Sequence, residues 1–275
     1  MKSSPKAPFQ LTILIKGAGE VASAIAHKLA IPCFRLCLTD LPEPTAVRRG
    51  VTFSEAIYDG EKMVEGVTAR LATSPGDAGA IWSVNKIPLF VDPSAKVREY
   101  LKPDIVVDAI IAKRNSGTRV SDASLVIGVG PGFMAPRDCH VVIETNRGHS
   151  LGRLISKGEA ESDTGVPAPV MGVTDRRVIR APSNGKLSTT RDIGVHLKIG
   201  DSLGHVNGIE LKAETDGVLR GFLRHGSTIA SGMKIGDIDP RDVEEYCFTI
   251  SDKGRTIAGG VLEAVLKYYP PTRTS

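Results

Sequence analysis

Residues 11–22 read Leu-Thr-Ile-Leu-Ile-Lys-Gly-Ala-Gly-Glu-Val-Ala, and this stretch decides the fold of the first half of the chain. The apolar run at 11–15 is short and rich in β-branched residues, as in a buried strand, whereas residues 23–29 have helical character. Between them stands a Gly-x-Gly-x-x-Ala turn. Its first glycine permits a sharp reversal, and its second lets the backbone approach a pyrophosphate. The order strand, glycine turn, helix predicts the start of a βαβ unit.

The next segment extends this pattern toward a nucleotide. A second strand is predicted at 34–39, and Asp40 follows it, where an acidic side chain can accept hydrogen bonds from a ribose. Gly17, Gly19 and Asp40 are therefore candidate cofactor-binding residues. The alternative is a turn that only reverses the chain, or that binds a different anion at the helix N-terminus. Glu20 favours this alternative, because its carboxylate would repel a closely held phosphate.

Further strands are predicted at 87–91, 105–109, 125–129 and 141–144, and a β-hairpin around Glu65 and Gly66 at 62–72. Strands that alternate with helices indicate a Rossmann-like parallel sheet, whose carboxyl ends share one edge. The segments after the strands should therefore converge. The candidate cofactor-binding residues in those segments are Arg48, Arg49, Lys113, Arg114, Asn115, Gly130, Gly132, Asn146, Arg147 and His149.

These residue types suit an anion. The planar guanidinium of arginine recognises phosphate or carboxylate through two hydrogen bonds, and the Gly-Pro-Gly loop at 130–132 offers backbone N–H donors. The sequence thus predicts an anion-binding crevice at the strand ends. The alternative is that each charged residue is an ordinary solvated turn residue.

The C-terminal half repeats itself without a gap, since Ala181 and Gly185 correspond to Ala213 and Gly217, 32 residues later. Each copy contains a turn, short strands and glycines at tight turns, and two interlocked copies predict a small β barrel. Over about 178–240 the pattern resembles the barrel-sandwich hybrid fold of biotinyl and lipoyl carrier domains. The repeat places Lys234, in Met-Lys-Ile, outside the carrier hairpin, so we expect no covalent biotin or lipoate.

The expected fold class is therefore an α/β Rossmann-like parallel sheet domain plus a small all-β barrel-sandwich hybrid domain, with a C-terminal helix. The domain bounds are 1–160, 176–243 and a C-terminal segment at 244–275. Apolar residues at helical spacing between Ile257 and Leu266 predict an amphipathic helix capped by Ser251 or Asp252. Its apolar stripe must be buried, so we expect it to pack back on the first domain.

Composition excludes several classes of protein. The chain has 275 residues, 41% of them hydrophobic, and a formal net charge of +4, as in an ordinary globular protein. It has no long basic run that would bind nucleic acid, no apolar run long enough to cross a membrane, and a polar start without a signal core. We expect a cytoplasmic protein. The four cysteines, at 33, 37, 139 and 247, form no redox or zinc motif, and we expect Cys33 and Cys37 to be core residues.

Six segments of the chain carry a resemblance to a known family, at 46–60, 112–115, 130–133, 144–149, 236–241 and 245–253. They resemble the YqeB family, whose members are known as accessory proteins of the selenium-dependent molybdenum hydroxylase system. The resemblance covers about residues 11–267. Through its Rossmann-like part the family is also distantly similar to the maturation factors of xanthine and carbon monoxide dehydrogenases.

The resemblance implies an accessory or maturation protein of a molybdenum hydroxylase. In that role Arg48, Arg49, Arg114 and Arg147 would bind an anionic molybdopterin-type cofactor or nucleotide, and the partners would be the client hydroxylase or other maturation factors. The alternative is an NAD(P)-dependent oxidoreductase that uses the glycine turn and Asp40. A homo-oligomer is compatible with the sequence.

Catalytic groups are sparse, and the sequence decides neither for nor against catalysis. It contains no nucleophile elbow, no His-Glu-x-x-His and no paired-cysteine motif, so no metal site is expected. His149 is the one histidine in a predicted crevice segment. Cys247, in a segment that resembles the family, is the candidate for sulfur or selenium handling. Its alternative role is a small buried side chain.

Overall fold

A computed structural model describes residues 11–31 and 34–270, so the polar start of the chain, Cys33 and the last residues lie outside the described part. The chain forms two compact units. The first contains the residues up to Pro42, Phe53–Asp163 and those from Ser251 on; the second contains Glu43–Thr52 and Thr164–Ile250. The sequence analysis placed residues 43–52 in the first domain, and the structure assigns them to the second unit.

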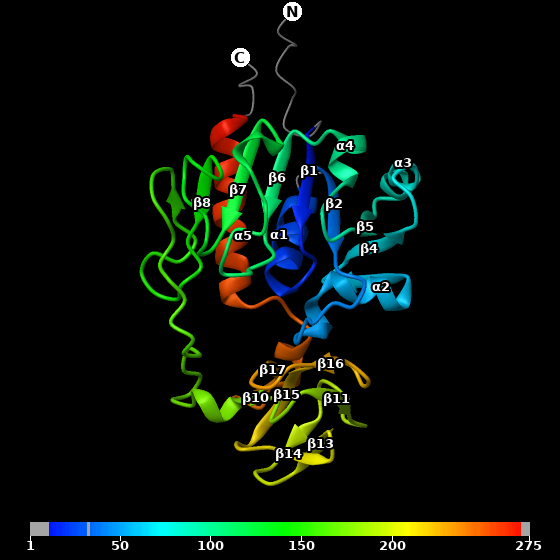
Figure 1. Cartoon of the computed structure of the whole chain (residues 1–275), viewed down its shortest axis with the longest axis vertical. Helices are drawn as coiled ribbons and strands as arrows, with labels where there is room; N and C mark the ends of the chain where they lie inside the picture. The colour runs from blue at the N-terminus through cyan, green and yellow to red at the C-terminus, as the bar shows by residue number, and fades with distance from the viewer. Residues whose placement is uncertain (1–10, 32–33, 271–275) are drawn as a thin grey trace, which may run out of the picture. The chain divides into compact units, whose positions relative to one another are not determined.

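The first unit is built on one nine-stranded sheet, shown in Figure 1. The strand order is β3-β4-β5-β2-β1-β6-β7-β8-β9. The seven strands from β4 to β8 in this order run parallel, whereas β3 and β9 at the two edges run antiparallel to their neighbours. The strands are β1 (Thr12–Lys16), β2 (Arg35–Asp40), β3 (Glu61–Val64), β4 (Val67–Ala72), β5 (Ile87–Val91), β6 (Ile105–Asp108), β7 (Leu125–Val129), β8 (Val141–Ile143) and β9 (Leu154–Ile155).

The predicted parallel sheet of a Rossmann-like domain was therefore wrong, because the sheet is mixed. The connections explain both antiparallel edges. Glu65 and Gly66, at φ 43° and 85°, form a two-residue turn between β3 and β4, which joins only antiparallel strands. Between β8 and β9 lies a loop at 144–153 without a crossover helix, and a parallel return needs about a dozen residues or more.

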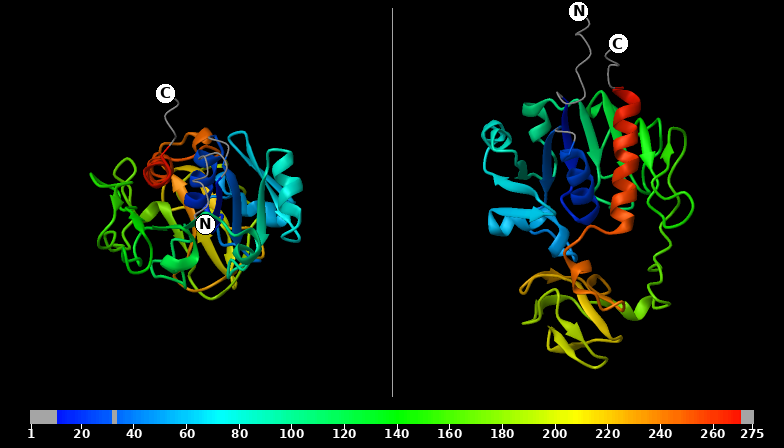
Figure 2. Two further views of the ribbon diagram at one scale, coloured as in Figure 1. Left: turned by 90° about the horizontal axis from the view of Figure 1, so that it is seen from above. Right: turned by 180° about the vertical axis from the view of Figure 1, so that it is seen from behind.

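Helices cover both faces of the sheet. The helix α1 (Glu20–Ala30) contacts α5 (Asp252–Tyr268), and Figure 2 shows the two side by side on one face. On the other face, α3 (Asp77–Ser83) and α4 (Val97–Leu101) contribute to a core cluster with the sheet. Because side chains alternate along a strand, residues at one face of the sheet belong to this cluster, with Leu14, Val106, Val126 and Val142 coming from β1, β6, β7 and β8. The short α2 (Ala56–Asp59) precedes β3, and no helix in the described part of the chain is long and apolar enough to cross a membrane.

The second unit shows the internal repeat strand by strand. In the first copy β11 (Gly185–Ser188), β12 (His196–Leu197) and β13 (Ser202–Val206) begin at 185, 196 and 202. In the second copy β15 (Gly217–Phe222), β16 (Thr228–Ile229) and β17 (Lys234–Asp239) begin at 217, 228 and 234, an offset of 32 each time. Likewise β10 (Val178–Arg180) corresponds to β14 (Ile209–Lys212). The repeat in the sequence thus places four pairs of equivalent strands.

These strands form two four-stranded antiparallel sheets, ordered β10-β17-β15-β12 and β14-β13-β11-β16. Replacing each strand of the first sheet by its repeat equivalent gives the second sheet, so the unit has an internal twofold relation. The predicted barrel-sandwich hybrid was nevertheless wrong. Within the described residues, no ladder joins the edge strands of one sheet to those of the other, and the strands do not close into a barrel. A repeat fixes the strand positions, but closure also requires pairing between edge strands.

Candidate anion-binding site at the carboxyl ends of the strands

Four loops of the first unit meet at one edge of the sheet, because β1, β6, β7 and β8 are adjacent and parallel. Glycines allow these loops to approach one another. A Cβ atom on Gly17 would lie 3.1 Å from the carbonyl oxygen of Ala109, and one on Gly132 would lie 2.5 Å from the Cα of Arg114. Both glycines have positive φ. The loops after the strands therefore converge as the sequence predicted, and small residues keep them together.

The glycine turn is braced by the acidic residue at the end of β2. Asp40 accepts one hydrogen bond from the backbone N–H of Ala18 (3.0 Å) and another, through its other carboxylate oxygen, from Leu41 (2.7 Å). Burial raises the pKa of Asp40, although these two hydrogen bonds partly offset that effect. Its carboxylate therefore supports the turn after β1. Glu20, the first residue of α1, accepts a hydrogen bond from Ser251 at the start of α5 (3.1 Å).

Three cationic side chains stand on the loops after β6 and β8. Lys113 pairs with Asp163 at 2.5 Å, and Arg147 binds Asp252 through two hydrogen bonds of 2.7 and 3.1 Å. Arg114 is exposed, and its side chain makes no hydrogen bond or ion pair with the residues that the structure describes. All three cations face solvent at least in part, so a dissolved anion can reach them.

Lys253, at the second residue of α5, is a cation of this edge that the sequence analysis overlooked. It is half-buried. Burial lowers the pKa of Lys253, and the charge of Arg147 lowers it further, whereas Glu20, Asp163 and Glu144 act in the opposite direction. A lysine held beside another cation is a candidate for binding an anion. Its only sequence signal was its place in a segment that resembles the YqeB family.

The buried carboxylate of Glu144 shapes the loop after β8. One of its oxygens accepts hydrogen bonds from the backbone N–H groups of Thr145 and Asn146, both at 2.7 Å, and the other accepts from Glu161 at 2.8 Å. The side-chain amide of Asn146 donates to the carboxylate of Glu161 at 2.6 Å. The loop that carries Arg147 is therefore ordered, and Asn146 is used within the protein.

His149 is exposed and lines an open pocket of about 470 Å³ between the loop after β8 and α5. Arg153, Thr256 and Glu263 line the same pocket. Gly130 packs against Thr145, since a Cβ there would lie 2.9 Å from its hydroxyl oxygen. The Gly-Pro-Gly loop thus supports the neighbouring loop of the edge by close packing.

Arg48, Arg49 and Cys247 all belong to the second unit. Arg48 is buried and donates to the carbonyl oxygens of Tyr246 (2.6 Å) and Thr249 (3.2 Å), which fastens residues 43–52 to this unit. Arg49 donates to the carbonyl oxygen of Phe222 and to Asp192, each at 2.7 Å. Burial raises the pKa of the Cys247 thiol to about 11. A fully buried, protonated thiol fits a packing role better than sulfur or selenium chemistry.

Among the described residues no group of three or more histidine, cysteine, aspartate or glutamate side chains is placed to hold a metal ion. Lys113, Arg114, Arg147 and Lys253 are cations of this edge, and the carboxylates of Asp163 and Asp252 pair with two of them. The binding of an anion by these cations stays a prediction.

No family model matches the chain. The chain is 47% identical over 266 residues to the uncharacterized protein YqeB of Escherichia coli strain K12, an alignment that covers 97% of this chain and 49% of that protein. This similarity supports the resemblance to the YqeB family that the motifs carry. The chain spans about half the length of this relative.

Likenesses to solved structures are weak. The product-bound ectoine utilization protein EutE (DoeB) from Ruegeria pomeroyi shares 15% identity at a TM-score of 0.25, covering 83% of this chain and 85% of that one. A succinylglutamate desuccinylase/aspartoacylase from Rhodobacter sphaeroides shares 14% at 0.26, with the same coverage. The protein TcdA (CsdL) shares 15% at 0.29, covering 92% and 87%. Scores this low support no conclusion about fold or activity.

Proposed function

We propose that this chain is an accessory or maturation protein of a molybdenum hydroxylase, and that it binds an anionic molybdopterin-type cofactor or its nucleotide form at the carboxyl edge of the first unit. The pathway, including its link to selenium-dependent enzymes, rests on the resemblance to the YqeB family. The class of ligand rests on the cations of the edge. The client hydroxylase or other maturation factors would be its partners.

One observation carries the proposal, namely that four cations stand on elements that meet at one edge of the sheet. Lys113 and Arg114 follow β6, Arg147 follows β8, and Lys253 lies in the first turn of α5. The N-termini of α1 and α5 also meet there, since Ser251 donates to Glu20. A helix N-terminus favours negative charge, so α5 adds to the attraction of the cations for a phosphate, whereas the carboxylate of Glu20 offsets the contribution of α1.

The ion pairs of the edge are compatible with the binding of a phosphate. The side chains of Lys113 and Asp163 are 58% and 40% exposed, and those of Arg147 and Asp252 are 43% and 74% exposed. Exposed ion pairs contribute only about 0–1 kcal/mol, so a ligand phosphate can replace the two aspartates at little cost. Arginine then binds the phosphate through two hydrogen bonds, as it now binds the aspartate.

The residues of the edge suit the phosphate of such a cofactor, but they provide no cysteine sulfur as a ligand. The described cysteines Cys37, Cys139 and Cys247 are all buried. The residues of the edge would therefore hold the cofactor by its phosphate. The pterin and its dithiolene would supply the metal-binding chemistry of the cofactor.

The competing proposal, an NAD(P)-dependent oxidoreductase, receives less support from the geometry. Asp40 uses both carboxylate oxygens to hold the backbone of Ala18 and Leu41, whereas a ribose would need them. Glu20 stands at the start of α1, where a pyrophosphate would lie. We therefore rank cofactor handling above hydride transfer.

The test is co-purification of the ligand with defined variants. Each protein is isolated from a host that makes molybdenum cofactor, and the bound pterin is measured by fluorescence after denaturation. We expect Arg114→Ala/Arg147→Ala to lower the affinity about tenfold or more, since each hydrogen bond to a charged group contributes about 1.5–3 kcal/mol. The matched control, Lys157→Ala/Arg176→Ala, removes two exposed cations elsewhere and should leave the bound pterin unchanged. Equal pterin in both double variants would contradict the proposal.

A further inference from the structure

The buried ammonium group of Lys16 lies at the carboxyl end of β1. It is not one of the four cations on which the proposed function rests. The side chain of Lys16 is only 9% exposed, and its Nζ lies 2.9 Å from a carboxylate oxygen of Asp108 at the end of β6. Nζ also donates to the hydroxyl of Thr118, which itself donates to Asp108. An ammonium has three N–H donors. Two are used here, and no described residue accepts the third.

Lys16 lines an open pocket of about 360 Å³, within the range of small-molecule sites. The pocket lies where the order of strands reverses. From β1 the chain proceeds to β2 and β5 on one side, whereas β6, its other neighbour, leads to β7 and β8. Ligands of open α/β sheets bind outside the carboxyl ends of the strands at such a point.

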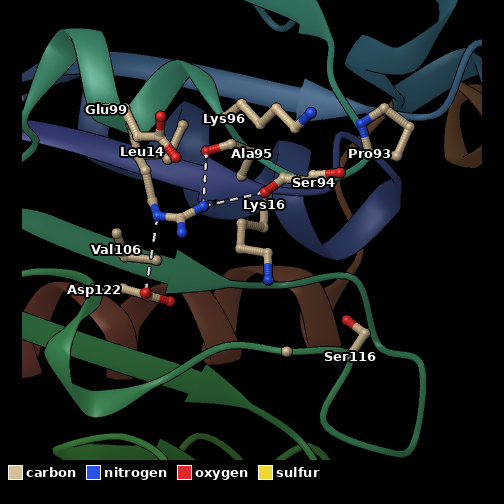
Figure 3. A pocket seen from close by; sticks show the side chains of 12 residues that line it. Leu14, Lys16, Pro93, Ser94, Ala95, Lys96, Glu99, Val106, Ser116 and Asp122 are labelled. Carbon is tan, nitrogen blue, oxygen red and sulfur yellow. Dashed lines mark hydrogen bonds and ion pairs between the residues drawn. The ribbon is translucent and has the colours of Figure 1, made fainter.

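Two loops form the walls of this pocket, one at 93–96 after β5 and one at 116–117 after β6. Figure 3 shows Lys16, Ser94 and Ser116 around one end of the opening. Within the described part of the chain, no hydrogen bond or ion pair engages the side chains of Ser94, Lys96 or Ser116. The pocket therefore offers two hydroxyls and the buried ammonium of Lys16, and the exposed Lys96 also lines it.

Both walls are held in place by their own hydrogen bonds. Asn115 accepts from the backbone N–H groups of Gly117 (2.9 Å) and Thr118 (2.8 Å), and its amide donates to the carbonyl oxygen of Thr118 (2.8 Å). In the opposite wall, Arg98 donates to the carbonyl oxygens of Ser94 (3.2 Å) and Ala95 (3.3 Å). Binding here would cost little ordering of the protein. Asn115, predicted to contact a cofactor, instead shapes this wall.

The opposite end of the pocket carries charges of both signs. Figure 3 shows Glu99 and Asp122 there, apart from each other and away from Ser116. Asp122 faces Arg98, which also lines the pocket, at 3.8 Å, and it accepts a hydrogen bond from the backbone N–H of Arg119 at 3.0 Å. Because the two carboxylates outnumber this arginine, a negatively charged group is favoured at the end with Lys16. The end with Glu99 and Asp122 suits a part of the ligand that carries hydroxyl or amino donors.

We infer that this pocket binds a small molecule through a carboxylate or phosphate group, which accepts hydrogen bonds from Lys16 and from the hydroxyls of Ser94 and Ser116. The site is independent of the proposed function. It lies on the sheet face that α3 and α4 cover, whereas Lys253 belongs to α5 on the other face. A small ligand is favoured, because the volume of about 360 Å³ is near the lower end of the range of ligand pockets.

The test is an NMR and calorimetric titration of the whole chain with inorganic phosphate and, separately, with acetate. We expect saturable shifts of the backbone amides of 94–96 and 116–118 with one of the two probes, which also tells a phosphorylated ligand from a carboxylate. In Ser94→Ala/Ser116→Ala the Kd should rise about tenfold or more. Both residues lie on exposed loop positions, so this variant should fold.

Three further variants complete the design. Lys157→Ala, which removes an exposed cation outside the pocket, should bind the probe like the unaltered chain, as should Arg114→Ala/Arg147→Ala, which alters only the edge. Lys16→Met/Asp108→Asn removes both buried charges together, and it should abolish the amide shifts. Failure of both probes to shift these amides, or an unchanged Kd in Ser94→Ala/Ser116→Ala, would overturn the proposal.

Discussion

Lys253 shows how a single residue acquires its properties from its surroundings. Its ammonium is half-buried beside Arg147, and burial first, then this neighbouring charge, lowers its pKa. The folded chain therefore releases the proton of Lys253 at lower pH than the unfolded chain does. By linkage, this group makes the folded state more stable as pH rises from the folded pKa to the unfolded one, about 10.4.

We expect Arg147→Ala to raise the pKa of Lys253 without restoring it fully, because burial remains. A bound phosphate should raise it further, since an opposite charge favours the ammonium. The measurement is NMR titration of the lysine ε-carbon signals, assigned with Lys253→Arg. The Arg137→Ala variant, which removes an exposed arginine elsewhere in the first unit, should not move it. An identical Lys253 pKa with and without Arg147 would show that the two side chains do not interact.

Single residues were also where prediction from sequence was weakest. Arg48 and Arg49 follow a strand that ends at the edge, so they were grouped with Arg114 and Arg147. The structure instead bonds both arginines to carbonyl groups of the second unit. Local sequence contains no sign of this, because the partners lie 173–201 residues away. Lys253 was missed for the same reason, since its neighbours depend on how α5 docks.

At the scale of elements, prediction succeeded where the sequence pattern was periodic. The repeat of 32 residues locates β15, β16 and β17 from β11, β12 and β13 without error. The glycine turn after β1 and the helix after it were also predicted from local signals. Strand direction at the edges was not, because β9 has only two residues and no pattern of its own. Whether sheets close into a barrel depends on pairing between edges, which the repeat does not encode.

The sheet that contains β15 and β17 provides the next prediction. Asp237 is fully buried and pairs with Arg177 and Arg220. Burial alone would raise the pKa of Asp237, but Lys234, Arg220 and Arg177 outweigh it and hold the pKa below its usual value. The stability from this carboxylate is therefore present above the unfolded pKa, about 3.9, and is lost as pH falls through the lower folded value.

Replacing Asp237 with Asn should lower the free energy of unfolding by about 3–5 kcal/mol at neutral pH, because it leaves the buried Arg177 without its counter-charge and removes one of the two carboxylates that pair with Arg220. The matched control is Asp216→Asn, which alters an exposed carboxylate of the same unit and should change stability by about 1 kcal/mol or less. Denaturant unfolding measures both. The loss of stability on acidification should also be smaller in Asp237→Asn than in the unaltered chain. A loss no larger than that of the control would mean that the buried charges are not coupled.

At the scale of the whole molecule, the two proposed anion sites belong to the first unit, and the second unit is an internally symmetric pair of sheets. The four cations of the edge fit a phosphate-bearing cofactor, and the pocket at Lys16 fits a smaller oxyanion. The relative YqeB is about twice as long as this chain, which aligns with 49% of it. Binding by this chain can therefore be tested by itself, and the activity of the longer relative is a separate question.

The most direct measurement is mass spectrometry, with pterin fluorescence and metal analysis, of the small molecule released when the chain is purified from a host supplied with molybdenum and selenium and then denatured. The account predicts a phosphate-bearing pterin in a stoichiometric amount. A nicotinamide dinucleotide without any pterin would contradict it, and would assign the glycine turn after β1 to an oxidoreductase.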